Sequence, residues 1–279
     1  MESVYLIMHQ RKPNVVELTR RIVEAFSRCN IRTGAEPWLR ERMGEMGESL
    51  ALPLQACDAV LSVGGDGTFL RANALASGED KPLLGINVGR VGFLTEVELD
   101  GLEAACRRLK EDDYTLDERM MLCAQAQGRS FLALNDVVLS RGGYARLIGV
   151  NAWIDSEPVG RFIGDGVIVS TPTGSTGYSL SAGGPIVCPE LSCMLITPIC
   201  AHSLQHRPVV TSDRQTITLR LDADHAQSAM VSVDGQEAMS FHAGQTICIT
   251  RSSVSARLIR LEPRSFFEMI RIKLTEWSC

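Results

Sequence analysis

The hydrophobic pattern of the chain changes near Asp117, and this change constrains the fold more than any other feature. Before it, short apolar runs such as residues 4–8 alternate with segments of helical spacing, such as 14–30. This alternation predicts a mostly parallel sheet with helices on both faces. After it, short and often alternating runs separated by turns indicate a β-sandwich or another layered β domain. We therefore predict two domains, a helical tail at 265–277, and a site in the cleft between the domains.

Composition limits the classes of binding partner and the cellular compartment that we expect for this chain. The formal net charge of −5 argues against a nucleic-acid binder that relies on a basic surface. No segment resembles a signal peptide, and no apolar stretch approaches the length that a bilayer requires. The nine cysteines are scattered, odd in number and without a C-x-x-C pair, which is typical of reduced thiols. We expect a cytoplasmic protein that binds neither nucleic acid nor membrane.

The stretch VLSVGGDGTFL, residues 60–70, places a carboxylate between glycines at the end of a predicted strand. Gly64, Gly65 and Gly67 let backbone N–H groups face a phosphate, and the following helix adds its N-terminal partial charge. Thr68 is suited to cap that helix or to contact a phosphate oxygen. The carboxylate would repel phosphate, so we interpret it as orienting a cation or accepting a proton from an attacking hydroxyl. The alternative is a tight turn whose aspartate caps the helix; no lysine follows, so this is not a P-loop.

Two later stretches combine polar side chains with apolar strands. Asn135 and Asp136 interrupt the apolar run 131–140, which fits a β-bulge or an Asx turn as well as hydrogen bonds to a ribose or a base. Residues 164–187 pack hydroxyl side chains between glycines, a density suited to a diphosphate or a ribose. Tyr178 offers a ring to stack on a base or to brace the loop. A polar surface loop is the alternative, but the apolar residues at both ends of the stretch favour binding.

Two further motifs carry less functional weight. His202 and His206 are four residues apart, but no further ligands stand near them, so a structural role is favoured over zinc. VSVDGQ, residues 231–236, is most simply a hairpin turn built on Asp-Gly.

Taken in order, these motifs resemble those of the NAD kinases, which phosphorylate the 2′-hydroxyl of the adenosine ribose of NAD to make NADP. The matching pieces are GGDGT, GINVGRVGFL at 85–94, LND at 134–136, GDGVIVSTPTGSTGYSLSAGGPI at 164–186, TPICAHSLQHRPVV at 197–210, and VSVDGQ. The resemblance covers nearly the whole chain, and the 164–186 block is its most specific part. It implies an N-terminal α/β Rossmann-like domain, 1–118, and a C-terminal β-sandwich, 119–250. A C-terminal segment, 251–279, would pack back on the first domain.

The resemblance also implies roles for particular residues. Asp66 would be the general base toward the ribose 2′-hydroxyl, and the glycines around it would handle the triphosphate of ATP with Mg²⁺ or Mn²⁺. Asn135 and Asp136 would contact the adenosine part of NAD, Asp165 its nicotinamide end, and 176–181 its adenine and diphosphate. The implied phosphate and ATP contacts are Gly64, Gly65, Gly67, Thr68 and Arg71. The implied NAD contacts are Asp66, Gly67, Asn135, Asp136, Arg146, Asp165, Thr176, Gly177, Tyr178, Ser179, Leu180, Ser181 and Gln236. No protein ligand to a metal is predicted.

The chain departs from the family pattern at two predicted NAD contacts. The usual Asn-Glu pair is Asn-Asp here, which keeps a carboxylate but shortens its reach by one methylene. The usual GSTAY has Gly177 in place of alanine, which loosens the loop without removing a polar group. We therefore expect the activity to be retained with altered affinity.

The leading hypothesis is phosphoryl transfer from ATP to NAD, with NAD and ATP as the partners and a homodimer or homotetramer as the assembly. A kinase that uses GGDGT on a lipid or sugar is one alternative, and the serine- and threonine-rich block at 164–186 argues against it. A non-catalytic NAD-binding sensor is the other, and the retained acidic residues argue against that.

Overall fold

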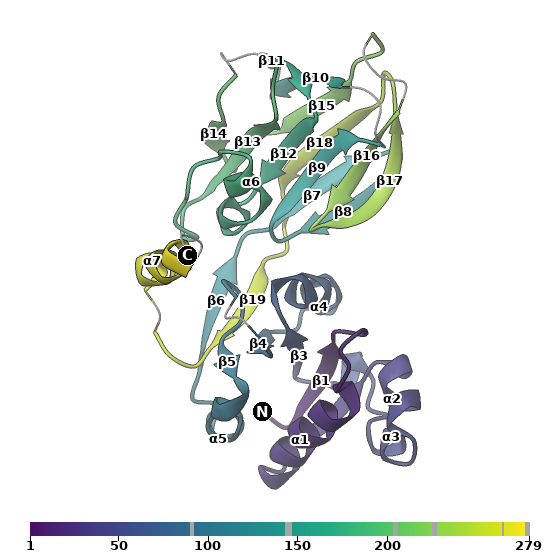
Figure 1. Ribbon diagram of the computed structural model, residues 1–279, viewed down its shortest axis with the longest axis vertical. Helices are drawn as coiled ribbons and strands as arrows, with labels where there is room; N and C mark the ends of the chain where they lie inside the picture. Colours follow the sequence, from purple (N-terminus) through teal and green to yellow (C-terminus); the bar gives the residue numbers. More distant parts are fainter. Residues whose placement is uncertain (90–91, 143–146, 203–205, 225–227, 264, 277–279) are drawn as a thin grey trace. The chain divides into compact units, whose positions relative to one another are not determined.

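The structure, a computed structural model, describes residues 1–89, 92–142, 147–202, 206–224, 228–263 and 265–276. Arg146, a predicted NAD contact, lies outside these ranges. The chain divides into two compact units: unit one is Met1–Glu118 with Ala256–Cys279, and unit two is Arg119–Ser255 (Figure 1). Within the described ranges, no helix is long and apolar enough to cross a membrane.

Unit one is built on a seven-stranded sheet with the strand order β2-β1-β3-β4-β19-β6, and β5 pairs with β4. The pairings of β1 with β2 and β3, and of β4 with β3, β5 and β19, are all parallel. The strands are β1 (Ser3–Met8), β2 (Arg32–Ala35), β3 (Ala59–Gly64), β4 (Leu83–Asn87), β5 (Val97–Glu98), β6 (Thr115–Arg119) and β19 (Ala256–Arg260). The carboxyl ends of β1, β3 and β4 therefore share one edge of the sheet.

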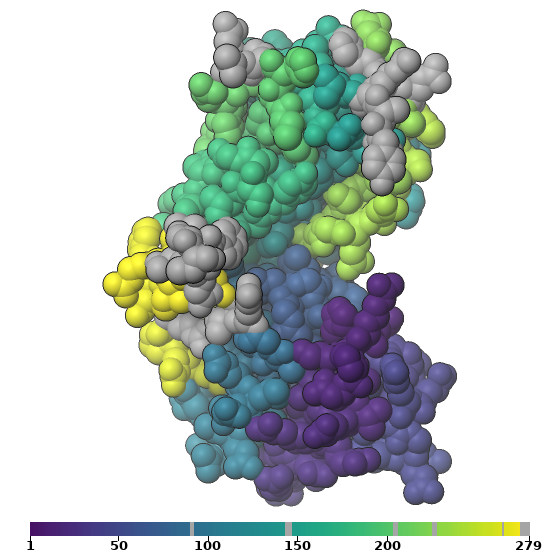
Figure 2. Space-filling view, viewed as in Figure 1, coloured from purple at the N-terminus to yellow at the C-terminus, as the bar shows by residue number. Residues whose placement is uncertain are grey.

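Helices cover both faces of this sheet. Alternate strand residues such as Leu6 and Leu61 face a core that they share with buried residues of α1 and α5. On the other face Gly85 packs against Phe69 of α4, and a Cβ on this glycine would lie 2.9 Å from the ring. Figure 2 shows that α1 to α3, in purple, form much of this unit's surface on the face drawn. The helices are α1 (Val15–Arg28), α2 (Pro37–Met43), α3 (Met46–Ser49), α4 (Asp66–Gly78) and α5 (Leu102–Lys110), with 3₁₀ turns η1 (Leu54–Ala56) and η2 (Leu99–Gly101). The predicted parallel α/β fold is confirmed.

Unit two consists of two six-stranded antiparallel sheets, ordered β11-β10-β15-β18-β7-β8 and β14-β13-β12-β9-β16-β17. Inward residues of both sheets, among them Val150 and Ile249 of the first and Leu139 and Val167 of the second, form one apolar core. The first sheet contains β7 (Leu122–Ala126), β8 (Arg129–Ala133), β10 (Ile148–Ile154), β11 (Glu157–Gly164), β15 (Ile217–Leu221) and β18 (Thr246–Arg251). The second contains β9 (Asp136–Arg141), β12 (Gly166–Ser170), β13 (Cys193–Ile199), β14 (Val209–Ser212), β16 (Ser228–Val233) and β17 (Gln236–His242). The predicted β-sandwich is confirmed.

The end of the chain belongs to unit one. β19 pairs with β4 in register Leu258 to Leu83, and α7 (Phe266–Glu276) follows it. The buried carboxylate of Glu96 accepts hydrogen bonds from Arg260, the last residue of β19, and from the backbone N–H groups of Leu261 and Glu262, which follow it. These contacts tie the end of β19 to the segment that follows β4.

Candidate functional site

The glycine turn after β3 leads directly into α4. Gly65 is the N-cap of this helix, and no side chain caps it. Asp66 is already the first helical residue, so the alternative in which this aspartate caps the helix is wrong. A Cβ on Gly64 would lie 2.4 Å from the hydroxyl oxygen of buried Thr68, so only glycine fits there. The turn therefore presents the uncapped N-terminus of a 13-residue helix, a favourable place for an anion.

The Asp66 carboxylate is held by backbone from the loop after β4. Oδ2 accepts from the N–H of Phe93 at 3.0 Å, and Oδ1 accepts from the N–H of Leu94 at 3.2 Å. Two hydrogen bonds from adjacent N–H groups fix the orientation of the carboxylate. Residues 92–94 carry no side chain that marks them as part of a site, and their only signal in the sequence is their position after a strand at the same sheet edge.

Two more polar side chains lie at this sheet edge, and the sequence analysis missed both. Lys12 follows β1 and donates from Nζ to the carbonyl of Val88. Asn87, the last residue of β4, pairs with Gly64 in the sheet. It donates from Nδ2 to the carbonyl of Gly89 at 2.9 Å, and its buried Oδ1 has no partner among the described residues. The carboxyl edge of a parallel sheet is where α/β proteins bind ligands.

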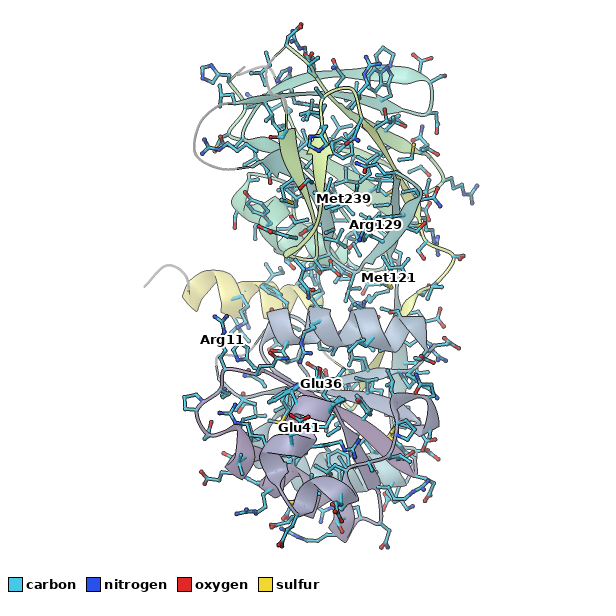
Figure 3. The ribbon with its side chains drawn as sticks, turned by 90° about the vertical axis from the view of Figure 1, so that its right-hand side faces the viewer. Arg11, Glu36, Glu41, Met121, Arg129 and Met239 are labelled. Carbon is cyan, nitrogen blue, oxygen red and sulfur yellow. The ribbon has the colours of Figure 1, made fainter. Side chains whose placement is uncertain are left out.

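Arg71, a predicted phosphate contact, is engaged by other groups in the structure. Its guanidinium makes two contacts with the carboxylate of Glu36, at 2.5 and 3.0 Å, and donates to the carbonyl of Met8 at 2.6 Å. Glu36 lies just before α2 (Figure 3). Bidentate arginine–carboxylate pairs are strong and directional, so these contacts join α4 to the start of α2. The phosphate contact of Arg71 stays a prediction.

In unit two, Asp234 organises the segment that contains Asn135 and Asp136. The hairpin turn between β16 and β17 has positive φ at Asp234 and Gly235, 49° and 75°, as Asp-Gly turns of this type require. The Asp234 carboxylate accepts from the N–H groups of Leu134 at 2.8 Å, Asn135 at 2.7 Å and Asp136 at 3.1 Å. The Asp-Gly pair predicts this hairpin from the sequence, but not the contact of its aspartate with residues 134–136.

The glycines of the 164–187 stretch bring Asn135 and Asp136 next to the helical turns η3 (Thr173–Thr176) and α6 (Tyr178–Ser181). A Cβ on Gly174 would lie 2.1 Å from the carbonyl oxygen of Asn135. A Cβ on Gly177 would lie 3.4 Å from Asn135 Nδ2 and 3.9 Å from Asp136 Oδ2. Asn135 Oδ1 is buried with no partner among the described residues. A buried amide oxygen without a partner is costly, so it fits a ligand that donates a hydrogen bond there.

Several hydroxyls of this stretch bond within the fold. Thr171 donates to the carbonyl of Leu134, Ser175 bonds with the backbone of Val187, and Ser179 bonds with Thr197. Thr176 donates to the carbonyl of Thr173. Much of the serine and threonine density therefore stabilises the turn, and the predicted NAD contacts of 176–181 stay predictions.

Three more of the predicted NAD contacts, Asp165, Tyr178 and Gln236, also belong to unit two. Asp165 pairs with Arg141, with 3.0 Å between Arg141 Nε and Asp165 Oδ1. Tyr178 is 47% exposed, and its pKa is raised by burial and, further, by Cys200, Asp165 and Asp136. Gln236 is exposed at the start of β17. The structure thus gathers Asn135, Asp136, Gly177 and Asp234 in unit two, whereas Asp66 and its glycine turn belong to unit one.

The buried pair Asp136 and Asp234 should make the stability of the folded chain depend on pH. Burial, and then the negative charge of Asp234, raise the pKa of Asp136 from 3.8 to about 7. At a pH between the two pKa values, Asp136 is protonated in the folded chain and ionised in the unfolded chain. Asp136 therefore lowers the free energy of unfolding progressively as the pH rises through this window. We expect Asp136→Asn to raise the melting temperature at pH 8 and to raise it progressively less toward pH 4.

Thermal unfolding followed at pH 4–8 measures this effect, and Asp155 provides a control of opposite sign. Asp155 also sits at a hairpin turn with positive φ, but hydrogen bonds from the backbone of Thr216 and from Gln215 lower its pKa. Asp155→Asn should therefore lower the melting temperature at pH 8. A gain for Asp136→Asn that does not change with pH would contradict the assignment.

Among the described residues, His202 and His206 belong to no cluster of metal-ligating side chains. His206 packs edge-on against Phe162, with 4.9 Å between ring centroids, in keeping with a structural role. Nowhere in the described ranges do three or more His, Cys, Asp or Glu side chains gather as metal ligands. The eight cysteines that the structure describes are free thiols.

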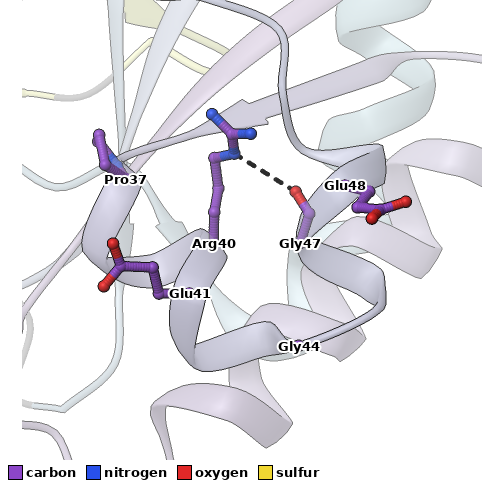
Figure 4. Close-up of a pocket in the computed structure, with 6 residues that line it drawn as sticks. All are labelled: Pro37, Arg40, Glu41, Gly44, Gly47 and Glu48. Carbon is purple, nitrogen blue, oxygen red and sulfur yellow. Dashed lines mark hydrogen bonds between the residues drawn. The ribbon is translucent and has the colours of Figure 1, made fainter.

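A pocket of about 320 Å³ lies between α2 and α3 (Figure 4). Its lining residues are Pro37, Arg40, Glu41, Gly44, Gly47 and Glu48. Arg40 already donates from Nε to the carbonyl of Gly47, and none of the predicted site residues lines this pocket. The pocket therefore takes no part in the candidate site.

The glycine turn of unit one and the polar residues gathered in unit two suit a protein that binds a phosphate-bearing ligand, and comparisons with known proteins identify the family. The profile of the ATP-NAD kinase N-terminal domain matches residues 4–114, and that of the ATP-NAD kinase C-terminal domain matches 134–261. The chain belongs to the ATP-NAD kinase family. The family and enzyme class predicted from the sequence are confirmed.

Relatives and solved structures agree with this assignment. The chain is 40% identical to an NAD kinase of Heliobacterium modesticaldum over 99% of each chain, and 38% identical to one of Moorella thermoacetica over 99% of this chain and 90% of that one. An NAD kinase structure from Archaeoglobus fulgidus in complex with ATP is 28% identical with a TM-score of 0.75, covering 93% of this chain and 94% of that one. Yeast NADH kinase complexed with NADH has the same fold, with a TM-score of 0.83 at 23% identity over 97% of this chain and 86% of that one.

Proposed function

We propose that this chain transfers the γ-phosphoryl group of ATP to the 2′-hydroxyl of the adenosine ribose of NAD, giving NADP. The observation that carries the proposal is the Asp66 carboxylate, held in a defined orientation at the N-terminus of α4 beside the glycine turn. A carboxylate there accepts the proton of the attacking hydroxyl, and the helix N-terminus favours the negative charge of the phosphates. Little covalent chemistry remains for the protein beyond alignment.

The proposal assigns NAD to the residues gathered in unit two. Asn135 offers a buried amide oxygen without a partner, and Asp136 offers a carboxyl group that accepts or donates according to its protonation. The exposed ring of Tyr178 provides a stacking surface. Asp165, Gln236 and residues 176–181 complete the proposed contacts, while Gly67 is shared between the NAD and phosphate contacts.

ATP would enter as its complex with Mg²⁺ or Mn²⁺. Such cations take oxygen ligands, keep several waters and are held largely by the phosphates of the nucleotide. The described residues of unit one fit this arrangement, because the buried Oδ1 of Asn87, which has no partner among them, supplies an oxygen atom at the sheet edge that carries the glycine turn.

Lys12 is proposed as a further phosphate contact at this edge. Its ammonium group lies at the carbonyl of Val88, one residue beyond Asn87, which pairs with Gly64. We expect Lys12→Met to raise the KM for ATP by about 10- to 100-fold and to leave the KM for NAD unchanged, since a charge-assisted hydrogen bond contributes ~1.5–3 kcal/mol. Lys81→Met is the matched control: Lys81 also donates to a backbone carbonyl, that of Gln55, but it precedes β4 and lies at the opposite edge. Equal effects of the two variants would refute a phosphate role.

A panel of acceptors tests the reaction. The purified chain is given MgATP with NAD, NADH, a diacylglycerol, a sphingoid base and fructose 6-phosphate, and ADP release and phosphorylated product are measured. The proposal expects product from NAD and none from the lipids or the sugar phosphate. Turnover with a lipid or sugar alone would show that NAD is not the acceptor. Tight NAD binding without turnover in the presence of Mg²⁺ or Mn²⁺ would show that the chain is a sensor.

We further propose a homodimer or homotetramer in the cytoplasm. Ile186, Leu191 and Val210 of unit two are apolar side chains with 38%, 55% and 51% of their surface exposed, which suits a contact between copies. The free thiols of the described cysteines suit a reducing compartment. Light scattering of the purified chain tests the assembly, and a monomer at micromolar concentration would contradict it.

A further inference from the structure

We propose that Gly92 is a positioning residue for Asp66: its missing side chain lets the backbone of residues 92–94 close on the carboxylate and hold it in the orientation needed for proton transfer. The inference rests on the proposed function, in which Asp66 is the general base. It adds the loop after β4 to the machinery and assigns a role to part of the GINVGRVGFL motif.

The geometry leaves no room for any side chain at position 92. A Cβ there would lie 2.0 Å from Asp66 Oδ1, 2.7 Å from its Cγ and 3.0 Å from its Oδ2. The next two residues donate their N–H groups to the same carboxylate, Phe93 at 3.0 Å and Leu94 at 3.2 Å. The approach that excludes a side chain is thus the approach that makes both hydrogen bonds.

Residues 92–96 are held by two further hydrogen bonds, so this part of the loop can hold the carboxylate firmly. The N–H of Gly92 donates to the hydroxyl oxygen of Thr95 at 3.2 Å, and the N–H of Glu96 donates to the carbonyl of Gly85 in β4 at 2.9 Å. Thr95 and Glu96 are both buried. Each carboxylate oxygen of Asp66 has more than one lone pair, so the two N–H bonds leave acceptor capacity for the substrate hydroxyl.

Two glycine variants separate this role from a general intolerance of glycine replacement. Gly92→Ala places a methyl group against the carboxylate, whereas Gly78→Ala is the control, because a Cβ on Gly78, at the opposite end of α4, meets nothing within 4 Å. We expect Gly92→Ala to lower kcat by about 10²-fold, the cost of a misplacement near 1 Å, with little change in the KM for NAD or ATP. Gly78→Ala should keep the wild-type kcat.

A double-mutant cycle shows whether Gly92 acts through Asp66. In an Asp66→Ala background the carboxylate is absent, so adding Gly92→Ala should leave the residual turnover and the melting temperature unchanged. An equally large loss in that background would make Gly92 a purely structural residue and overturn the proposal. If Gly92→Ala alone fails to fold, removal of the carboxylate should restore folding, and a double variant that is also unfolded would overturn the proposal.

The same series separates failure of this inference from failure of the proposed function. Inactive Asp66→Asn together with fully active Gly92→Ala would refute the role of Gly92 and leave Asp66 as the base. Near wild-type turnover in Asp66→Asn would refute the role of Asp66 itself.

Discussion

Asp66→Asn should lower kcat for NAD phosphorylation by about 10²–10⁴-fold, the usual contribution of a general base. The loss corresponds to ~3–5 kcal/mol of transition-state stabilisation. Asparagine keeps the shape of the side chain and an acceptor oxygen for one of the two hydrogen bonds from Phe93 and Leu94, but its amide nitrogen cannot accept the other and the side chain cannot take the proton of the attacking hydroxyl. The expected result is therefore a loss in kcat with KM for NAD and ATP near the wild-type values.

The measurement is initial-rate kinetics of the two purified chains with both substrates varied, and thermal unfolding confirms that the variant is folded. Glu79→Gln is a suitable control, because Glu79 lies at the opposite end of α4 from Asp66. Its carboxylate accepts a hydrogen bond from the side chain of Gln55 and takes no part in the proposed site. A loss confined to KM would show that Asp66 binds substrate without acting as the base.

Asp234→Asn should raise the KM for NAD by about tenfold. The carboxylate accepts three backbone N–H groups from residues 134–136, and these position Asn135 and Asp136. The amide group of asparagine replaces one acceptor oxygen by a donor, so at least one buried N–H loses its partner, at a cost of ~1–3 kcal/mol. If about 1.4 kcal/mol of this cost appears as weaker NAD binding, the KM for NAD rises tenfold.

Asp155→Asn is the matched control for this prediction. Asp155 also occupies a positive-φ hairpin position and accepts from the backbone N–H of Thr216 at 2.8 Å, but it lies in the other sheet of unit two. It should lower stability without changing the KM for NAD. Isothermal titration with NAD gives the affinity directly, and equal affinities for the wild type and Asp234→Asn would contradict the positioning role.

The fold could be predicted because its signals are local. The apolar face of α1, with Val15, Leu18 and Ile22 buried and Arg20 and Arg21 exposed, is visible as helical spacing in the sequence. The period-2 runs of unit two likewise mark strands whose alternate residues enter one core. Such patterns predict the elements correctly because each helix or strand buries its own apolar face.

The arrangement within the site could be predicted only in part, because its contacts join distant residues. GGDGT marks the turn, but its bonds to Phe93 and Leu94 depend on the order of strands in the sheet. Asp234 stands about a hundred residues after Asn135 and reaches it only because β16 pairs with β9. The hydroxyls of 164–187 show a further limit: their density predicts ligand contacts, which stay a prediction, and it does not reveal that several of them also bond to other parts of the fold.

The most direct test of the central claim is the identity of the product made from NAD and MgATP by the purified chain. An NADP-specific dehydrogenase reports a phosphate at the 2′ position and ignores other isomers. The account predicts stoichiometric formation of NADP and ADP by the wild type. ADP release without NADP, or a product phosphorylated elsewhere on the dinucleotide, would contradict it.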